Sequence, residues 1–552
     1  MSGPAGAGAT GLDALLAAAE PMDPRPLGGL VGRLRDLDPT VLVVPGSAPR
    51  GDSRIASDDP AAVAIRGLTH DSRTVVPGNL FVAVPGAHAD GHAFVAAAVR
   101  AGATAVIVER ALPDTAVPQV VVPGARRALA EAAAWWYGDP SREMGVIGIT
   151  GTDGKTTTSL LAAAALATAG VPTGVIGTVA TQIGGIREAN AAHSTTPEAP
   201  QLQRTLRAMV AAGDRAAVIE TTSHGLALDR VAAIGYDVAI LTNLTHEHLE
   251  LHGTFEAYRA AKRSLFERLA AGSGNPAKPT ITWPRTGIVN ADDASAPMFA
   301  AATVAAGARL MTYGRAVGSD VHLRDVADDG HGLRIGYRTA DGPAELKLRL
   351  AGRFNAHNAL AVVVLGRALG LDPLAVRAGL EAVEAIPGRM ERVERGQPFG
   401  VVVDYAHSPA SLELVLDELG PVAEARGGTL IVVFGSAGER DREKRPMLGR
   451  IAAERCRVVV ITDEDPRAED RAAILHEIAA GARGVAVRPE AILEIADRRT
   501  AMHEAMSRAR PGDIVVLAGK GHEATILYAD RAEPWNERAE AERALAALGW
   551  GT

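Results

Sequence analysis

The sequence predicts an α/β protein with three domains, each built on a mainly parallel or mixed sheet. Short apolar runs alternate with helical patterns along most of the 552 residues, and this alternation is typical of βαβ units. The pattern restarts at "MGVIGIT" (144–150) and again at "FGVVVDYA" (399–406). The length also suits about three or four domains of ~100–200 residues each.

The first part of the chain predicts a leader and a small domain. Residues 1–60 are rich in Gly, Ala and Pro, so we expect a loose leader with one or two short helices. Residues 61–144 predict a small α/β domain. Its expected strands and helices are "NLFVAV" (79–84), "HAFVAAAVRAG" (92–102), "TAVIVE" (104–109) and "ARRALAEAAAWWYG" (125–138).

Residues 145–387 predict a central domain. After 144–150, further strands are expected at 216–221, 238–243 and 286–291. Between about 310 and 350 the strands become shorter and more polar, which indicates an antiparallel appendage. A helix-rich stretch then runs from 358 to 385 and ends at Pro387 and Gly388, where we expect a hinge.

Residues 388–552 predict a C-terminal domain with a third parallel sheet. Its strands are expected at 399–406, 429–435, 457–463 and 513–519, and apolar runs of this length favour strands buried on both faces. This pattern indicates a Rossmann-like domain.

Composition narrows the class of protein. Apolar residues make up 47%, charged residues 22%, and the net charge is −8, which is typical of soluble globular proteins and gives no general attraction to nucleic acid or membranes. The single cysteine, Cys456, excludes an intramolecular disulfide. No signal peptide or membrane span is evident, so we expect a cytoplasmic protein.

The stretch "GITGTDGKTTT" (148–158) predicts a phosphate-binding loop between a strand and an Ala-rich helix. It departs from the strict Walker A pattern because Ile149 stands where that pattern has glycine. Small residues let backbone N–H groups point at an anion, and the helix dipole adds partial positive charge. Lys155 would reach the terminal phosphates and Thr156 would hold Mg²⁺. The alternative is a glycine turn with an incidental lysine.

Two other polar clusters follow predicted strands. Glu220, in "IETTSHGLALDRV", ends a strand and would suit Mg²⁺ or a catalytic water; the alternative is a solvated or capping carboxylate. The histidines of "THEHLELH" invite a zinc site, but the HExxH pattern fails because position 250 is glutamate.

Eight motifs together resemble the Mur ligases, the amide-forming enzymes of peptidoglycan precursor synthesis. They occur in order over about 66–548. The eight motifs are "TGTDGKTTT", "TTSHGL", "TNLTHEHLELHGTFEAYRAAKRSLF", "AGRFNAHNALA", "GRME", "VVVDYAHSPASL", "GSAGERDREKRP" and "LAGKGHE", and the first segment, "LTHDSRTVVPGNLFVAVPGAHADGHAF", lies upstream of them. The first segment resembles the uridine-nucleotide-binding domain of the tripeptide-forming members.

This resemblance implies a central P-loop ATPase domain and a defined reaction. ATP would phosphorylate the D-Glu side-chain carboxylate of UDP-N-acetylmuramoyl-L-alanyl-D-glutamate, and the amine of a diamino acid would attack the acyl phosphate. The implied cofactors are ATP and Mg²⁺, with Lys262 carrying a CO₂-derived carbamate. The enzyme is expected to act as a monomer without nucleic acid or membrane.

The resemblance also assigns residues to four sites. Catalysis would rest on Lys155, Lys262, His248 and His407, and the metals on Thr156, Glu220, His248 and the Lys262 carbamate. ATP would contact Gly151, Thr152, Asp153, Gly154, Lys155, Thr156, Thr157, Asn355, Asn358, Arg389 and Asp404. The UDP-muramoyl-dipeptide would contact Ser72, Ala87, His88, Ala89, Thr195, Thr196, Thr222 and Arg230. The amino acid would contact Arg440, Glu464, Asp465, Pro466, Arg467, Gly519 and Glu523.

Two departures from the family pattern matter. Asp153 replaces the usual asparagine of the P-loop and adds negative charge near the phosphates. In the amino-acid motif, Arg467 suits a distal carboxylate, whereas Asp465 replaces a neutral amide, so it would favour an ammonium or pair with Arg467. The motif favours meso-diaminopimelate over L-lysine or L-ornithine by a narrow margin.

Two other functions stay open from the sequence. One is another ligase of the superfamily, such as a folylpolyglutamate-synthetase-like enzyme, against which the "DSR…PGNLFVA" segment argues. The other is a P-loop ATPase that acts as a switch without ligation.

Overall fold

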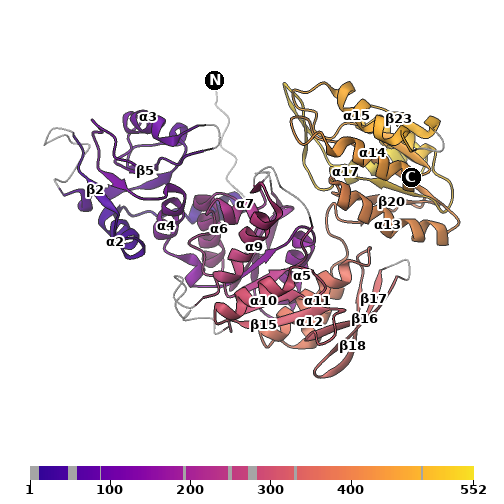
Figure 1. The fold of residues 1–552 in the computed structure, drawn as a ribbon, viewed down its shortest axis with the longest axis horizontal. Helices are drawn as coiled ribbons and strands as arrows, with labels where there is room; N and C mark the ends of the chain where they lie inside the picture. The colour runs from indigo at the N-terminus through magenta and orange to yellow at the C-terminus, as the bar shows by residue number, and fades with distance from the viewer. Residues whose placement is uncertain are drawn as a thin grey trace, which may run out of the picture. The chain divides into compact units, whose positions relative to one another are not determined.

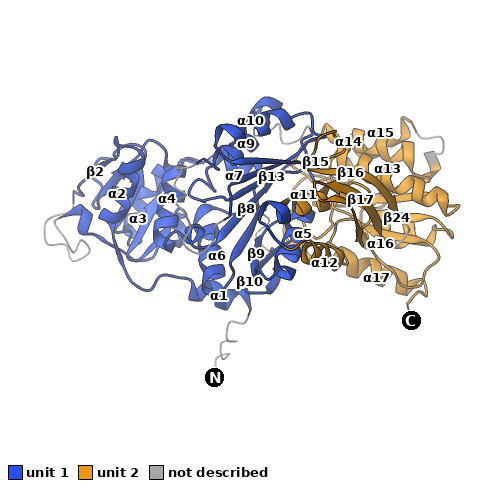
Figure 2. Ribbon diagram, turned by 90° about the horizontal axis from the view of Figure 1, so that it is seen from below, with its two compact units in different colours: residues 1–312, 365–371 blue, residues 313–364, 372–552 orange. Residues whose placement is uncertain are grey.

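A computed structural model describes residues 11–47, 59–86, 89–190, 194–245, 252–270, 283–328, 332–485 and 489–551. The fold is mixed α/β with mostly parallel sheets, as the sequence predicts (Figure 1). The chain forms two compact units, residues 1–312 with 365–371 and residues 313–364 with 372–552 (Figure 2). Within the described ranges, every helix is too short or too polar to cross a bilayer.

The first unit begins with a five-stranded sheet in the order β2-β7-β6-β5-β4. The strands are β2 (Leu42–Val44), β4 (Gly67–Thr69), β5 (Asn79–Val82), β6 (Ala105–Val108) and β7 (Gln119–Val121). All neighbours are parallel except β2, which pairs antiparallel with β7. Helices α2 (Leu27–Leu37) and α4 (Ala125–Tyr137) bury apolar side chains in one core with this sheet, and α3 (Val95–Arg100) contributes to a second.

The expected short helices are present in the described part of residues 1–60, but they are packed and not part of a loose leader. Helix α1 (Leu12–Ala18) packs with α6 (Ala199–Ala211), and the backbone N–H of Leu12 donates to Glu188 Oε1 at 2.9 Å. Helix α2 buries Leu27 and Leu30 completely. Its apolar residues at 27, 30, 31 and 34 follow the helical i, i+3, i+4, i+7 spacing, a signal that the Gly- and Ala-rich composition masks.

The same unit holds eight neighbouring strands of an 11-stranded sheet, in the order β11-β10-β9-β12-β8-β13-β14-β15. The central strand β8 (Gly145–Thr150) is buried along its whole length and lies parallel to β12 (Ala216–Glu220) and β13 (Val238–Leu241). The other strands are β9 (Thr173–Ile176), β10 (Ala180–Ile183), β11 (Ile186–Ala189), β14 (Thr286–Asn290) and β15 (Arg309–Gly314). Its helices include α5 (Lys155–Thr168), α7 (Ser223–Ala227), α9 (Phe255–Glu267) and α10 (Ala296–Ala305).

The second unit starts with the antiparallel strands that the sequence predicts near 310–350. These are β16 (Val321–Asp328), β17 (Leu333–Thr339) and β18 (Gly342–Leu348). The helices α11 (Asn355–Ala368) and α12 (Pro373–Glu381) follow.

The rest of the second unit is a doubly wound sheet in the order β19-β20-β24-β21-β22-β23. The strands are β19 (Glu391–Arg392), β20 (Gly400–Val403), β21 (Leu430–Phe434), β22 (Val458–Ile461), β23 (Ile492–Glu494) and β24 (Ile514–Leu517), all parallel except β19. Helices α13 (Pro409–Ala425), α14 (Lys444–Arg455) and α15 (Arg471–Arg483) pack in one core, and α16 (Arg498–Ser507) and α17 (Glu537–Ala547) in another. The hairpin of β25 (Thr525–Leu527) and β26 (Ala532–Pro534) completes it. In such sheets, ligands bind beyond the carboxyl ends of the strands.

Candidate active site

The glycine loop lies between β8 and α5, as predicted. Gly154 has φ +81° and directly precedes the first residue of α5, and no side chain caps that helix. Gly151 has φ +149°, and a Cβ there would stand 1.9 Å from Thr242 Oγ1. Only glycine fits such a position without displacing its neighbours. The uncapped N-terminus of α5 therefore presents its first N–H groups, as a phosphate site requires.

Side chains of the loop and of the segment after β13 hold this geometry. Lys155 Nζ donates to the carbonyl oxygens of Gly151 at 3.0 Å and Thr152 at 2.6 Å. Asn243 accepts from the backbone N–H groups of Thr152 and Asp153, through its own carbonyl and side-chain oxygens respectively. The Lys155 ammonium thus rests on loop carbonyls at the helix N-terminus.

Glu220 is 1% exposed at the end of β12 and receives three hydrogen bonds. Thr156 Oγ1 donates to its Oε2 at 3.0 Å, and Thr178 donates from its N–H at 3.0 Å to Oε1 and from its hydroxyl at 2.8 Å to Oε2. The structure therefore brings the predicted metal residues Thr156 and Glu220 together. Thr178 was missed by sequence reasoning, because it lies 42 residues from its partner.

Lys262, on α9, is 2% exposed and reaches the glycine loop. Its Nζ donates to the Gly151 carbonyl at 2.7 Å and lies 4.6 Å from the centre of the Tyr258 ring. The Tyr258 hydroxyl in turn lies 3.0 Å from Thr152 Oγ1. The predicted ligand His248 falls outside the described residues. His252, the last histidine of "THEHLELH", packs edge-on against Tyr258, and burial together with the Lys262 charge lowers its pKa.

The predicted dipeptide-binding threonines form one hydrogen-bonded group. Thr196 Oγ1 donates to the Glu220 carbonyl at 2.7 Å and lies 3.0 Å from Thr222 Oγ1, while Thr195 bonds Thr178 through their hydroxyls at 2.9 Å. Arg230 donates to the Thr196 carbonyl at 2.9 Å and pairs with Glu198 at 2.6 Å. The Arg230 guanidinium therefore already has a carboxylate partner, Glu198.

The predicted nucleotide-binding residues of the first domain are only partly described. Ser72 begins a short 3₁₀ helix that Asp71 caps, and the carbonyl of Ala89 accepts from the Gly86 N–H at 2.9 Å. Ala87 and His88 lie outside the described residues. The Arg73 hydrogen bond lowers the pKa of Asp71 to about 2.

In the second unit, the other predicted ATP residues fall at two places. On α11, Asn358 donates to Asn355 Oδ1 at 2.8 Å. At the end of β20, Asp404 accepts from the backbone N–H groups of Met390 and Ala406. Next to it, the Tyr405 ring lies under the Arg389 guanidinium at 4.6 Å and beside the His407 ring at 4.7 Å.

The predicted amino-acid residues lie mostly in two loops at the carboxyl ends of β22 and β24. Lys520 Nζ pairs with Asp465 Oδ1 at 2.8 Å and Glu523 Oε2 at 2.5 Å, and the Tyr405 hydroxyl donates to Glu523 Oε1 at 3.2 Å. Arg467 holds its loop through a backbone N–H bond to the Leu527 carbonyl. Pro466 and Gly519 lie in the same two loops, and Arg440 is exposed.

Two outcomes differ from the sequence analysis. The suggested Asp465–Arg467 pair does not form, since Asp465 bonds Lys520 and the Leu527 N–H. Lys520 itself was not singled out, although it stands in the quoted motif "LAGKGHE". Buried atoms of Arg467 (Nε) and Glu464 (Oε2) have no hydrogen-bond partner among the described residues, and water or a ligand satisfies such groups.

Three family patterns match successive segments of the chain: "Mur ligase family, catalytic domain" at 64–137, "Mur ligase middle domain" at 149–366 and "Mur ligase, glutamate ligase domain" at 388–521. The UDP-N-acetylmuramyl-tripeptide synthetase of Roseiflexus sp. is 48% identical over 497 residues, which cover 89% of this chain and 96% of that protein. The chain belongs to the Mur ligase family. It is therefore an ATP-dependent ligase.

One further relative and two solved structures are also similar to this chain. The UDP-N-acetylmuramoyl-L-alanyl-D-glutamate–2,6-diaminopimelate ligase of Solibacter usitatus is 39% identical over 494 residues, covering 89% of this chain and 95% of that protein. A solved structure of a ligase with that name has 29% identity and a TM-score of 0.62, covering 89% of this chain and 97% of its own. The folylpolyglutamate synthase of Mycobacterium tuberculosis shares the fold at 20% identity and a TM-score of 0.57, covering 71% of this chain and 91% of its own.

Proposed function

We propose that the chain is a tripeptide-forming Mur ligase of peptidoglycan precursor synthesis. It would join a diamino acid to UDP-N-acetylmuramoyl-L-alanyl-D-glutamate with ATP and Mg²⁺. The observation that carries the proposal is the 48% identity to a tripeptide synthetase over 89% of the chain, which spans the first segment as well as the ligase core. The arrangement of side chains around the glycine loop supports the same chemistry.

The residues at the glycine loop fit a nucleotide triphosphate with Mg²⁺. The α5 N-terminus and Lys155 would neutralise phosphate charge as the D-Glu carboxylate attacks the γ-phosphorus. Thr156 and Glu220 supply the oxygen ligands that Mg²⁺ prefers. Phosphate oxygens and water would supply further ligands.

Lys262 would contribute as a carbamate. Its neutral amine would add to CO₂ and release a proton, which replaces a cation with an anion beside the glycine loop. The burial of Lys262 and its 2.7 Å contact with Gly151 support this assignment, because an anion there would stand near the metal site. His248 would add a neutral imidazole ligand.

The second half-reaction needs a diamino acid whose amine attacks the acyl phosphate. Glu464 and Glu523 would bind ammonium groups, and Arg467 would bind a carboxylate in a bidentate manner. The buried Arg467 Nε without a partner among the described residues supports a carboxylate at this end of the substrate. We therefore favour meso-diaminopimelate over L-lysine and L-ornithine.

The two alternatives make different demands. A folylpolyglutamate-synthase-like enzyme would not use the first segment, residues 64–137. This segment lies within the part of the chain that the similarity to the tripeptide synthetase covers. A P-loop switch would hydrolyse ATP without the UDP-dipeptide or an amino acid.

A product assay tests the proposal. The protein is incubated with ATP, Mg²⁺, UDP-N-acetylmuramoyl-L-alanyl-D-glutamate and each of the three diamino acids, and products are identified by mass spectrometry. We expect a UDP-tripeptide with ADP release that depends on both substrates. Release of ADP without either substrate and without tripeptide would support the switch instead.

A further inference from the structure

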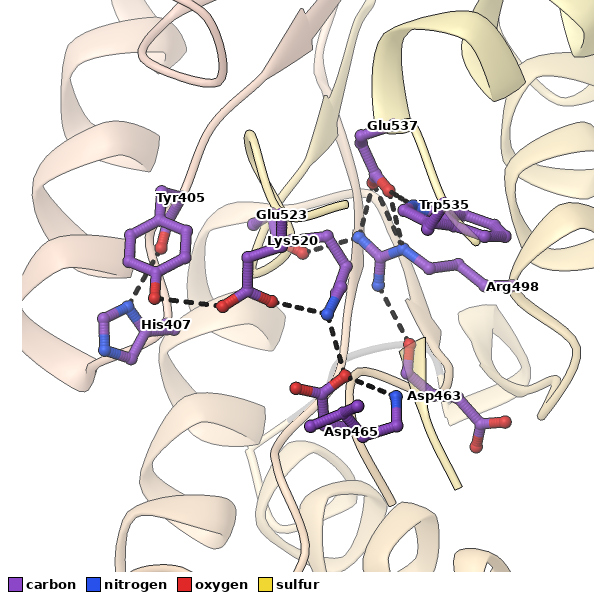
Figure 3. A network of polar contacts seen from close by, with 11 residues as sticks. Tyr405, His407, Asp463, Asp465, Arg498, Lys520, Glu523, Trp535 and Glu537 are labelled. Atoms are coloured by element: carbon purple, nitrogen blue, oxygen red, sulfur yellow. Dashed lines mark hydrogen bonds and ion pairs between the residues drawn. The ribbon is translucent and has the colours of Figure 1, made fainter. Parts of the chain in front are cut away.

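The amino-acid loops of the second unit enclose one lysine completely. Lys520 is 0% exposed, and its Nζ lies between Asp465 Oδ1 at 2.8 Å and Glu523 Oε2 at 2.5 Å (Figure 3). The two carboxylates come from different loops, one after β22 and one after β24. Lys520 is therefore the cation that joins the two halves of the predicted amino-acid site.

Electrostatics keep this lysine charged. Burial alone would lower the pKa of Lys520, but the carboxylates of Glu523 and Asp465 outweigh it, so the pKa stays above its ordinary value. A buried ammonium with two carboxylate partners is favourable only as a unit, since removal of one member leaves an uncompensated charge. Lys520 thus keeps its charge at neutral pH.

The contacts of Asp465 show how an aspartate can take the place of the amide that the resemblance to the family motif leads us to expect. Its Oδ1 accepts from Lys520 Nζ and from the backbone N–H of Leu527 at 3.0 Å. An asparagine oxygen could accept the same two hydrogen bonds. The extra negative charge of the aspartate faces Lys520, so it does not need Arg467 as a partner.

Arg467 is consequently left for a ligand. It makes no ion pair with any described residue, and its buried Nε lacks a hydrogen-bond partner there. Glu464, three residues earlier, also has a buried oxygen without a partner in the described part of the chain. The site then offers one cation and one anion for a zwitterionic side-chain terminus.

We propose that Lys520 is the residue that sets amino-acid specificity, because it neutralises Asp465 and leaves Arg467 to bind a distal carboxylate. This inference rests on the proposed function and names the substrate class of its amino-acid site: diamino acids that carry a second carboxylate. Lys520 acts through Asp465, so it is a positioning residue. The Tyr405 hydroxyl bond to Glu523 Oε1 at 3.2 Å fixes the other carboxylate.

Replacement of Lys520 tests the inference. In Lys520→Met a side chain of similar length remains, but Asp465 and Glu523 lose their counter-ion. We expect the ratio of kcat/KM for meso-diaminopimelate over L-lysine to fall by about tenfold or more, mainly through a higher KM for diaminopimelate. Lys520→Arg should keep most of the wild-type ratio because it restores the cation.

A matched control separates specificity from stability. Arg457 pairs with the buried Asp513 at 2.6 Å, but at the amino ends of the strands, on the opposite edge of the sheet. Arg457→Met should lower the melting temperature and leave the substrate ratio unchanged. An unchanged ratio in folded Lys520→Met would overturn the inference.

A second variant covers the case in which Lys520→Met does not fold. The double substitution Lys520→Met with Asp465→Asn removes a cation and an anion together, so we expect folding and a ratio within about threefold of wild type. A ratio as low as tenfold below wild type would refute charge compensation. Failure of the wild-type protein to form any UDP-tripeptide would instead refute the proposed function.

Discussion

Thr156 Oγ1 donates a 3.0 Å hydrogen bond to Glu220 Oε2. This contact joins the first turn of α5 to the end of β12, two elements whose sequence positions are 64 residues apart. It forms because β12 lies beside β8 with Glu220 opposite Ile149. Both carboxyl ends therefore meet where the glycine loop begins, and two oxygen ligands stand together.

Glu220→Gln should weaken the response to Mg²⁺. The amide keeps the shape of the side chain but removes the charge that a divalent cation needs. We expect the Mg²⁺ concentration for half-maximal activity to rise at least ~10-fold, measured by titration of ADP release. Asp214 is a buried carboxylate just before the amino end of β12. The substitution Asp214→Asn is the control and should leave the Mg²⁺ response as in wild type.

Lys155→Met should abolish ligation while the protein still folds. The loss of one charged contact to the transferred phosphoryl group costs on the order of 10²–10³ in rate. Turnover with saturating substrates gives the test, and circular dichroism checks the fold. The exposed Lys347 provides the control substitution Lys347→Met. Near-normal turnover of Lys155→Met would exclude the assignment of the glycine loop to ATP.

Lys262 should give a carbamate signal when the protein is incubated with ¹³C-bicarbonate at mildly alkaline pH. Carbamate formation requires the neutral amine, so higher pH and bicarbonate favour it. We expect Lys262→Arg to lose both the NMR signal and most activity, because a guanidinium keeps the charge but forms no carbamate. If Lys262→Arg kept wild-type activity, the carbamate would have no role.

Acid should destabilise the second unit through Glu469. The hydrogen bond from the fully buried Arg445 lowers the pKa of Glu469 from 4.5 to about 2. A carboxylate whose folded-state pKa is depressed stabilises the fold above about pH 4.5, and this contribution disappears as the pH falls towards 2. Urea unfolding between pH 7 and pH 2 should show a smaller loss of stability with acid in Glu469→Gln than in wild type. Glu413→Gln, at an exposed pair with Arg455, should unfold with the wild-type pH dependence.

The sequence predicted the features that depend on neighbouring residues, and it missed contacts between residues far apart in the chain. The glycine loop and most parallel strands follow from short patterns of apolar and small residues. Lys262 is 111 residues from Gly151, so no local pattern indicates their contact, and only the family resemblance pointed to it. Lys520 is 55 residues from Asp465, and a lysine between two glycines gives no sign of burial. For α2, the Gly- and Ala-rich composition outweighed the helical periodicity, so a short helix was expected there but its packing against the first sheet was not.

Asp465→Asn should raise the preference for diaminopimelate. The asparagine oxygen can still accept from Lys520 and from the Leu527 N–H, so the loop geometry should persist. The substitution removes one negative charge near Arg467, and Lys520 then has Glu523 as its single carboxylate partner. A second carboxylate on the substrate is repelled less, whereas the side-chain ammonium of lysine loses an attractive charge. We expect the ratio of kcat/KM for meso-diaminopimelate over L-lysine to rise about threefold to tenfold. The control Asp417→Asn, at an exposed position on α13, should leave this ratio unchanged. An unchanged ratio in Asp465→Asn would show that this residue does not read the side chain.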